Sequence, residues 1–495
     1  MDAVDRLPSR TSQSHPLMIA HVPSCPDGGR IGITFCPGKK QASAMSGAWD
    51  RDLGSDLDRV RDWGARAVVT LVEGHELEAL GVTDIGEEVR LRHMAWYHLP
   101  IPDVSTPDAA FESVWRKVAP GLRSRLRNGF DIVIHCKGGL GRAGTVAARL
   151  LVELGLAAED AIAAVRAVRP GAIETSAQED HVFSCAPIKE AEPGRSPDAI
   201  ADRAIGAMVG LAIGDAIGTT LEFTARDTYP PLRGMVGGGP FSLQAGEWTD
   251  DTAMALALAD SLLACSGLDE ADLMRRFADW HDNGAYSCTG SCFDIGTTIA
   301  AAMDRWRHTG DPVAGSSDPH TAGNGSLMRL APVAVYFWRN RSALRDAATR
   351  QSCTTHAAPA AVRACSLFAE MLADAIVGHS LDVVLMRDAA RQWAGRQRES
   401  IRGSGYVVES LEAALWSVAS TGSFAEAVLT AANLGEDADT TAAIAGQLAG
   451  AVYGFSAIPR HWLDRLAWKD RIVELAKSLF AAEALNVGAP REVTF

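Results

Sequence analysis

The feature that most constrains the fold is a change of pattern at about residue 200. Before it, helical patterns alternate with short runs rich in β-branched residues, and the runs predict strands at 31–36, 65–72, 95–101 and 130–136. The intervening stretches predict helices near 52–63, 108–127, 142–155 and 157–168. Such alternation is typical of an α/β domain with a mostly parallel sheet. From Ala201 to about Ala482 strand signals nearly vanish, and Ala-rich patterns predict an all-α domain.

The chain of 495 residues is therefore expected to contain two domains of unequal size. Residues 30–185 form the predicted α/β domain, and residues 203–490 form the helical domain. Between them, the polar and Pro-containing stretch at 188–200 predicts a linker over 186–202. Residues 1–29 are expected to be an N-terminal extension.

Two ladders of small residues mark the helical half. One comprises Gly206, Gly210, Gly214 and Gly218, and the other comprises Ala442, Gly446, Gly450 and Gly454. A glycine inside a helix costs about 1 kcal/mol relative to alanine. Spacing of four places each ladder on one helix face. We expect two central, neighbouring helices whose backbones approach closely.

Composition narrows the class of protein. A net charge of −14 argues against a binder of nucleic acid or of anionic membranes. Nine scattered cysteines and an N-terminus without an apolar segment predict a cytoplasmic protein rather than a disulfide-linked one. The uncharged stretch Thr440–Pro459 is as long as a membrane span, but a buried helix is the favoured interpretation.

The strongest short motif in the first half is His135-Cys136-Lys137-Gly138-Gly139-Leu140-Gly141-Arg142. It follows a predicted strand and opens a predicted helix. Its glycines let the backbone N–H groups of residues 137–142 point at an anion, and a helix N-terminus adds positive potential. That environment favours a thiolate at Cys136, and Arg142 offers a planar fork for two phosphate oxygens. The motif predicts covalent phosphoryl transfer without a metal.

Such a reaction needs a general acid, and Asp103, in the Pro-flanked segment HLPIPD, is the candidate. With these motifs, residues 30–185 resemble the cysteine-dependent dual-specificity phosphatases. The resemblance implies that Cys136 is the nucleophile, Arg142 the phosphate clamp and Asp103 the general acid. The family usually has Ser or Thr after the arginine, where this chain has Ala143. This departure raises the question of whether the phosphocysteine is broken down quickly.

Two acidic clusters begin apolar helices in the second half, Thr249-Asp250-Asp251 and Asp437-Ala438-Asp439-Thr440. Capping accounts for one acid per helix but not for two acids and a hydroxyl in both places. Buried carboxylates need a neutralising cation. Oxygen ligands without His or Cys favour Mg²⁺ or Mn²⁺ over zinc. The sequence therefore predicts one or two hard metal ions held by both clusters.

These clusters belong to six motifs that resemble the ADP-ribosylglycohydrolase family over about residues 203–480. The other motifs are the first glycine ladder with Glu222, FDIG at 293–296, GNGSLMR at 323–329 and THxxP at 355–359. The resemblance implies an all-α orthogonal bundle with two Mg²⁺ ions that cleaves the glycosidic bond between ADP-ribose and an acceptor. It implies the metal ligands Thr249, Asp250, Asp251, Asp437, Asp439 and Thr440.

The same resemblance implies roles around the substrate. Glu222 is expected in a loop next to the substrate, and Asp294 at the scissile bond or the ribose. Asn324, Ser326 and His356 are expected to line the ADP-ribose pocket. Glu436 stands where the family usually has glycine.

The sequence thus predicts a bifunctional hydrolase that acts on an ADP-ribosylated and on a phosphorylated protein or small molecule. An alternative is that the first domain binds a phosphorylated ligand but turns over poorly. A less favoured alternative makes the helical domain a non-catalytic reader of ADP-ribose. The acceptor of ADP-ribose stays open, and an ADP-ribosylated nucleic acid is not ruled out.

Overall fold

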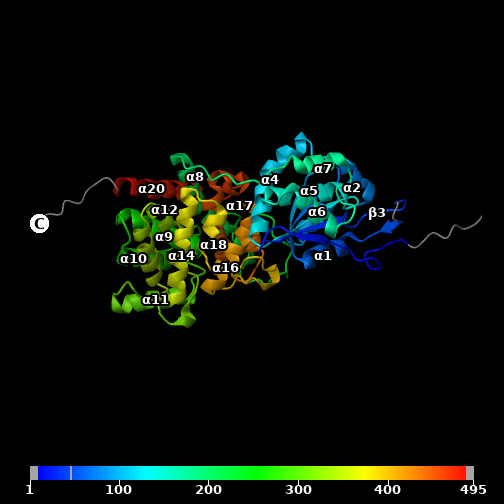
Figure 1. Cartoon of the computed structure of the whole chain (residues 1–495). Coiled ribbons are helices and arrows are strands. Elements are labelled where there is room, and N and C mark those ends of the chain that lie inside the picture. Colours follow the sequence, from blue (N-terminus) through cyan, green and yellow to red (C-terminus); the bar gives the residue numbers. More distant parts are fainter. Residues whose placement is uncertain (1–8, 45–46, 487–495) are drawn as a thin grey trace, which may run out of the picture. The chain divides into compact units, whose positions relative to one another are not determined.

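The computed structural model describes residues 9–44 and 47–486, and they divide into two units (Figure 1). The first runs to Glu190 and the second starts at Ala191, apart from the short segments Ala394–Gln397 and Ser420–Gly422, which group with the first unit. The division falls within the stretch from which we predict a linker. The next helix begins at Pro197, where the Ser196 hydroxyl accepts a hydrogen bond from the N–H of Ala199.

The first unit is built on a five-stranded sheet with the order β1-β2-β7-β5-β6. All pairings are parallel except that of β1 with β2. The strands are β1 (Ala20–Pro23), β2 (Arg30–Phe35), β5 (Ala65–Thr70), β6 (Ala95–His98) and β7 (Asp131–Cys136). Two short strands, β3 (Lys40–Gln41) and β4 (Trp49–Asp50), form a separate ribbon. The predicted α/β fold with a mostly parallel sheet is confirmed, but β1 lies in the stretch expected to be an extension.

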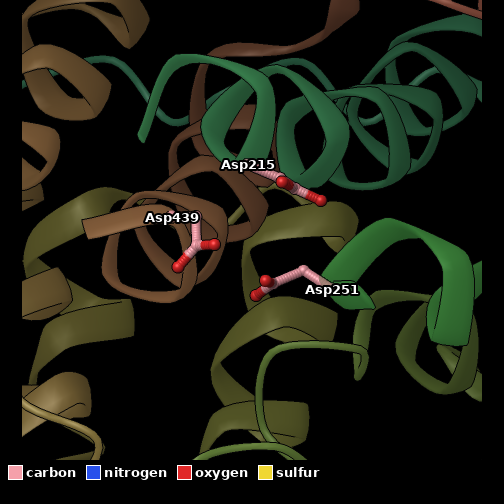
Figure 2. Close-up of side chains that lie close together, drawn as sticks. All are labelled: Asp215, Asp251 and Asp439. Atoms are coloured by element: carbon pink, nitrogen blue, oxygen red, sulfur yellow. The ribbon is translucent and has the colours of Figure 1, made fainter. Parts of the chain in front are cut away.

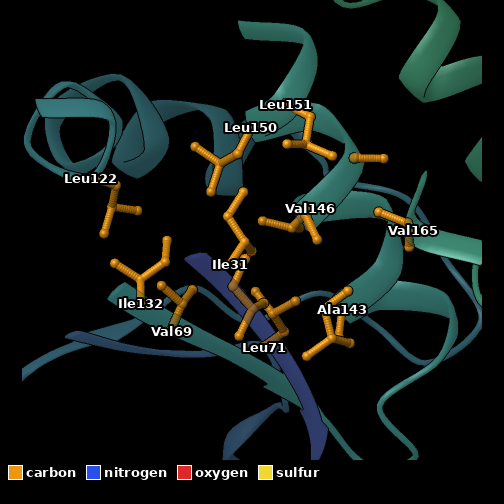
Figure 3. Packing of buried hydrophobic residues seen from close by; sticks show 14 of the residues in the cluster. Ile31, Val69, Leu71, Leu122, Ile132, Ala143, Val146, Leu150, Leu151 and Val165 are labelled. Carbon is orange, nitrogen blue, oxygen red and sulfur yellow. The ribbon is translucent and has the colours of Figure 1, made fainter. Parts of the chain in front are cut away.

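Helices cover both faces of the sheet because side chains alternate along each strand. The helices are α1 (Leu53–Trp63), α2 (Gly74–Leu80), α3 (Ile85–Leu91), α4 (Ala109–Arg127), α5 (Gly141–Glu153), α6 (Ala158–Val168) and α7 (Ser176–Phe183). On one face, Ile31, Val69 and Ile132 pack against Leu122 of α4 and Val146 of α5 (Figure 3). On the other face, residues of α1, α2 and α3 pack against Val68 and Val133. This packing holds the end of β7 and the start of α5 in place.

The second unit is all-α, as predicted (Figure 1). Its helices are α8 (Pro197–Gly218), α9 (Asp250–Ala264), α10 (Glu270–Asn283), α11 (Thr297–Thr309), α12 (Ala331–Phe337), α13 (Arg341–Cys353), α14 (Pro359–Val377), α15 (Leu381–Leu385), α16 (Val407–Ala419), α17 (Phe424–Ala432), α18 (Ala438–Tyr453), α19 (Arg460–Leu463) and α20 (Lys469–Asn486).

The two glycine ladders pack α8 against α18, and this confirms the prediction of neighbouring helices. A Cβ atom added to Gly210 would lie 2.2 Å from the carbonyl oxygen of Gly446, and one added to Gly450 would lie 1.9 Å from that of Gly206. Only glycine permits this approach, so the helical cost of these glycines is offset by backbone contact. The contact brings the N-terminus of α18 beside the C-terminal half of α8.

One helical segment among the described residues, Pro197–Leu221, could cross a membrane by length and composition alone. However, 89% of its apolar window is buried inside the unit. Such burial is typical of a core helix. The helix from the uncharged stretch 440–459, α18, is likewise almost wholly buried, as we predict from the sequence.

Candidate functional site

The first site lies where β7 ends. Cys136 is the last residue of β7, its side chain is almost fully buried, and α5 begins five residues later at Gly141. The N–H of Gly139 donates a hydrogen bond to Cys136 Sγ at 3.2 Å. Gly139 has φ +68°, and a Cβ atom there would lie 2.4 Å from the backbone of Thr34. The close approach and the positive φ both require glycine, and together they aim the loop at the sulfur.

Arg169 holds this loop through hydrogen bonds to its carbonyl groups, and no local sequence signal marks this residue. Its guanidinium donates to the carbonyl oxygens of Gly138 and Gly139 at 3.0 and 2.9 Å. The Gly138 carbonyl and the Gly139 N–H belong to one planar peptide and point in opposite directions. Because Arg169 engages the carbonyl side, the N–H side faces Cys136. The loop is therefore arranged to bind an anion at the sulfur before any ligand arrives.

Arg142 is buried and held by three acceptors. It donates to both carboxylate oxygens of Glu76, at 2.6 and 3.0 Å, and to the carbonyl oxygen of Ile101 at 2.9 Å. Its Nη2 atom also lies 2.9 Å from Oδ1 of Asp103. Burial raises the pKa of Glu76, but the hydrogen bonds from Arg142 outweigh it and hold that pKa below its ordinary value. Glu76 thus keeps the guanidinium oriented, and it is not among the residues predicted from the sequence.

The structure brings the predicted general acid into the same site. The Asp103 side chain is 56% exposed and reaches Arg142 from the loop after β6. Gln178, which is fully buried, donates to the carbonyl oxygen of Ser105 at 3.2 Å and accepts from the N–H of Glu174 at 2.9 Å. Glu174 in turn accepts from the N–H of Gly141 at 2.8 Å. The acid loop and the cysteine loop are therefore linked through Gln178 and Glu174.

Thr145 does not supply the hydroxyl that Ala143 lacks. Ala143 is fully buried. The hydroxyl of Thr145, two residues on, donates back to the carbonyl oxygen of Gly141 at 2.8 Å. That hydroxyl is engaged within its own helix.

The second site is formed by carboxylates from three helices of the all-α unit. Asp215 of α8, Asp251 of α9 and Asp439 of α18 point toward one another (Figure 2), with ligand oxygens within 4.8 Å of each other. A second group, Glu222, Asp437 and Asp439, satisfies the same limit. Asp439 belongs to both groups. Residues more than 180 positions apart in the chain meet here because the glycine contact sets α18 against α8.

Hydroxyl groups complete the first group. Thr249 Oγ1 lies 2.9 Å from Asp215 and 3.2 Å from both Asp251 and Asp439. Asp215 also accepts hydrogen bonds from the N–H of Thr249 and from the N–H and hydroxyl of Thr252, at 2.9, 3.0 and 2.6 Å. Asp215 is not among the site residues predicted from the sequence. Its signal was a carboxylate inside the first glycine ladder.

The electrostatics of the cluster call for a cation. Burial, and then the neighbouring Asp439, raise the pKa of Asp215 and of Asp437 to about 7 and that of Asp294 to about 11. Asp251 Oδ1 is buried and has no hydrogen-bond partner. An orphaned carboxylate oxygen is costly in a protein interior unless it binds a metal ion. Acidic and hydroxyl oxygens suit a hard divalent cation, so the residues fit the predicted metal centre.

A cavity of about 780 Å³ opens beside these carboxylates. The residues predicted to surround a substrate or metal that line it are Glu222, Asp250, Asp294, Asn324, His356, Asp437, Asp439 and Thr440. Asn324 donates to Asp437 Oδ2 at 2.8 Å. Burial lowers the pKa of His356 to about 3, so this imidazole is neutral, and its Nδ1 atom pairs with Thr355 Oγ1 at 2.9 Å.

Ser326 is not among the residues that line this cavity. Its hydroxyl is fully buried and pairs with Ser352 Oγ at 2.8 Å and with Cys365 Sγ at 3.4 Å. These contacts join the GNGS loop to α13 and α14. Ser326 therefore supports the loop that carries Asn324.

Comparison with known proteins matches both halves separately. Residues 196–487 match the ADP-ribosylglycohydrolase family model, and residues 43–182 match the Swiss Army Knife protein, DSP-PTPase phosphatase domain. The ADP-ribosylarginine hydrolase Tri1 of Pseudomonas putida is 46% identical over 296 residues, which cover 58% of this chain and 80% of that protein. Cyclin-dependent kinase inhibitor 3 of Rattus norvegicus is 30% identical over 188 residues, covering 37% of this chain and 84% of that protein.

Among solved structures, an ADP-ribosylglycohydrolase-related protein complex superposes with a TM-score of 0.51 and 38% identity. The match covers 57% of this chain and 99% of that one. The family model spans more than half of the chain, and it covers the unit that holds the carboxylate cluster. The chain belongs to the ADP-ribosylglycohydrolase family, is a hydrolase, and carries a DSP-PTPase phosphatase domain before the family's helical domain.

Proposed function

We propose that the helical domain removes ADP-ribose from arginine side chains in a reaction that depends on Mg²⁺. The observation that carries the proposal is the pair of carboxylate groups that share Asp439 beside the cavity. Arginine as the acceptor is supported by the similarity to ADP-ribosylarginine hydrolases from two bacteria, at 46% and 45% identity. Mn²⁺ has the same ligand preference and is the alternative ion.

The residues present divide the work in a defined way. Asp215, Asp251, Asp439 and Thr249 would hold one ion, and Asp437 with Glu222 would contribute to a second. Bound there, Mg²⁺ would polarise a water molecule and bind ribose hydroxyls. Asn324 orients Asp437 through its amide, and Asp215 orients Thr249. Asp294 lines the same cavity, and its carboxyl group is the candidate for proton donation to the leaving guanidine.

The direct test is release of ADP-ribose from peptides that carry it on arginine or on serine. Mg²⁺ should support cleavage of the arginine conjugate, and chelation should abolish it. Asp439→Asn should lose the activity because Asp439 serves both groups. Cleavage that persists under chelation, or an equal rate on both conjugates, would overturn the proposal.

For the phosphatase domain we propose hydrolysis of phosphomonoesters through a phosphocysteine. Cys136 Sγ would attack the phosphorus, the ester oxygen would leave with a proton from Asp103, and Arg142 would bind the equatorial oxygens. Water would then attack the phosphocysteine, give its proton to Asp103 and release phosphate and the thiolate. The supporting observations are the hydrogen bond from the N–H of Gly139 to Cys136 Sγ and the 2.9 Å approach of the Arg142 guanidinium to Asp103.

The alternative, a domain that traps or binds its ligand, is favoured by Ala143 and by the engaged hydroxyl of Thr145. Rapid-mixing measurements of product release from an aryl phosphate distinguish the two functions. A burst equal to the enzyme concentration followed by negligible turnover would support trapping. Steady turnover that Cys136→Ser abolishes would support a working phosphatase.

A further inference from the structure

Three residues that line the cavity of the helical domain share an unusual backbone conformation. Phe223, Asp294 and Glu436 have φ values of +58°, +60° and +62°. Residues with a Cβ atom pay a conformational cost in this region, and such residues cluster where function needs them. Asp294 already has a place in the proposed reaction. Phe223 and Glu436 do not.

Phe223 and Glu436 are held side by side. The N–H of Phe223 donates to the carbonyl oxygen of Glu436 at 2.8 Å, and the N–H of Glu436 donates to the carbonyl oxygen of Thr224 at 2.9 Å. The pair of hydrogen bonds fixes both backbones in the strained conformation. Phe223 is nevertheless 69% exposed as a residue, so burial does not offset the strain. Its ring contacts that of Phe241, with centroids 6.3 Å apart at an interplanar angle of 74°, and the rest of the ring is exposed at the rim of the cavity.

Phe223 and Glu436 lie at the end of the cavity where the second carboxylate group is found, because each is adjacent in sequence to a member of that group. Phe223 directly follows Glu222, and Glu436 directly precedes Asp437, and both of these carboxylates belong to the group shared with Asp439. Adjacent Cα atoms are 3.8 Å apart. If the ribose hydroxyls bind through the metal at these carboxylates, the group that leaves the anomeric carbon lies close to Phe223 and Glu436.

The chemistry of the pair matches a guanidinium group. A guanidinium stacks on an aromatic face and pairs with a carboxylate in a planar fork. Glu436 already takes such a partner, since Arg402 Nη2 lies 3.3 Å from Glu436 Oε2. The Arg402 side chain is 59% exposed, and an exposed ion pair of this kind is worth little. An incoming guanidinium can replace it at small cost.

We propose that Phe223 and Glu436 form the subsite for the acceptor arginine, with the guanidinium stacked on Phe223 and paired with Glu436. This inference rests on the proposed arginine-linked substrate and adds the residues that select it. The two residues determine specificity and take no part in bond cleavage. Arg402 releases Glu436 when the substrate binds.

The test compares Phe223→Leu and Glu436→Gln in the full chain with wild type on an ADP-ribosylarginine peptide. Each variant should raise KM about fivefold, the upper size expected from a cation–π or ionic contact at an exposed site. The kcat and the inhibition constant of ADP-ribose, which lacks the guanidine, should change by less than about twofold. Phe223→Tyr keeps the ring face and should restore the low KM. Matched controls are Phe183→Leu and Glu474→Gln, at exposed positions that are not among the residues lining the cavity.

An unchanged KM in both variants would overturn the subsite and leave the proposed function intact. Equal weakening of ADP-ribose would place the pair at the nucleotide instead, and it would also overturn the inference. Wild-type protein that fails to release arginine would overturn the proposed function, and the subsite with it. Thermal melting of each variant identifies any loss of folding.

Discussion

At the scale of single residues, both sites depend on side chains that position the groups with the chemistry. Glu76 and Arg169 orient the phosphate-binding elements, and Asp215 gathers two threonines at the carboxylate cluster. Each acts through hydrogen bonds to one or two partners. Their loss should therefore have effects that can be separated from the loss of the reacting group.

Glu76→Gln should destabilise the phosphatase domain, because it leaves the buried guanidinium of Arg142 without its charged partner. Removing one member of a buried pair costs about 3 kcal/mol. Because the folded-state pKa of Glu76 is lowered, its contribution is present above the ordinary glutamate pKa of about 4.3 and is lost as the pH falls through the lower folded value. Urea unfolding at pH 7 and at low pH should show the gap between variant and wild type closing in acid. A constant gap would contradict this account.

Ala143→Ser should speed breakdown of the phosphocysteine, because it supplies the hydroxyl that Thr145 cannot. A steady-state rate on an aryl phosphate about tenfold higher, with a smaller burst, is the expected result for an added proton-relaying group. Ala147→Ser, at another buried position of α5, is the matched control. A rate that rises equally in both variants would contradict a specific role for residue 143.

At the scale of elements, the helical site depends on the contact between α8 and α18. The glycines on both helices allow the carboxylates at their ends to meet. The group of Asp215, Asp251 and Asp439 cannot form on one helix alone, because Asp215 and Asp439 lie on different helices.

Gly210→Ala should separate these helices, because the new methyl group would lie 2.2 Å from the carbonyl oxygen of Gly446. Overpacking of this kind costs about 3 kcal/mol. Metal affinity, measured by titration calorimetry on protein that remains folded, should weaken as well. Gly194→Ala, with ordinary spacing around its Cβ atom, should have no effect on either measurement. Equal behaviour of the two variants would exclude the helix contact as the cause.

At the scale of the whole molecule, we expect the stability of the helical unit to depend on a cation bound at the carboxylate cluster. Without a cation, the buried carboxylates repel each other, and Asp251 has an oxygen with no partner. Binding of an ion to the folded state stabilises it by mass action.

Saturating Mg²⁺ should therefore stabilise the folded helical unit, by about 2.7 kcal/mol at a hundred times Kd. Its melting temperature should rise accordingly. Asp251→Asn should melt higher than wild type without metal and should lose most of the Mg²⁺ effect. Burial and the neighbouring carboxylates raise the pKa of Asp251 well above its ordinary value, so folding at neutral pH has a free-energy cost that asparagine avoids. Differential scanning calorimetry with and without chelator measures both. An Asn variant that melts lower without metal would contradict the electrostatic account.

The two fold classes, the phosphate loop and the helix contact can all be predicted from short-range sequence patterns. The alternation before residue 200 and the Ala-rich helices after it predict both fold classes, since each periodicity has a local cause. The segment from His135 to Arg142 predicts a phosphate loop because its parts are contiguous. The glycine ladders predict a helix contact because glycine in a helix requires compensation.

Other features depend on residues that only folding brings together. Glu76 and Arg142 are 66 positions apart, and Glu222 and Ala438 are 216 apart. A glutamate near the start of α2 or an arginine after α6 has no local signature of a role. Ser326, which the motif favoured as a pocket residue, packs against Ser352 instead. Backbone strain at Phe223 and Glu436 likewise arises from hydrogen bonds between distant segments. Short-range spacing thus determines which reacting groups the chain carries. Long-range contacts determine which neighbouring residues orient these groups, shift their pKa values and select their substrate.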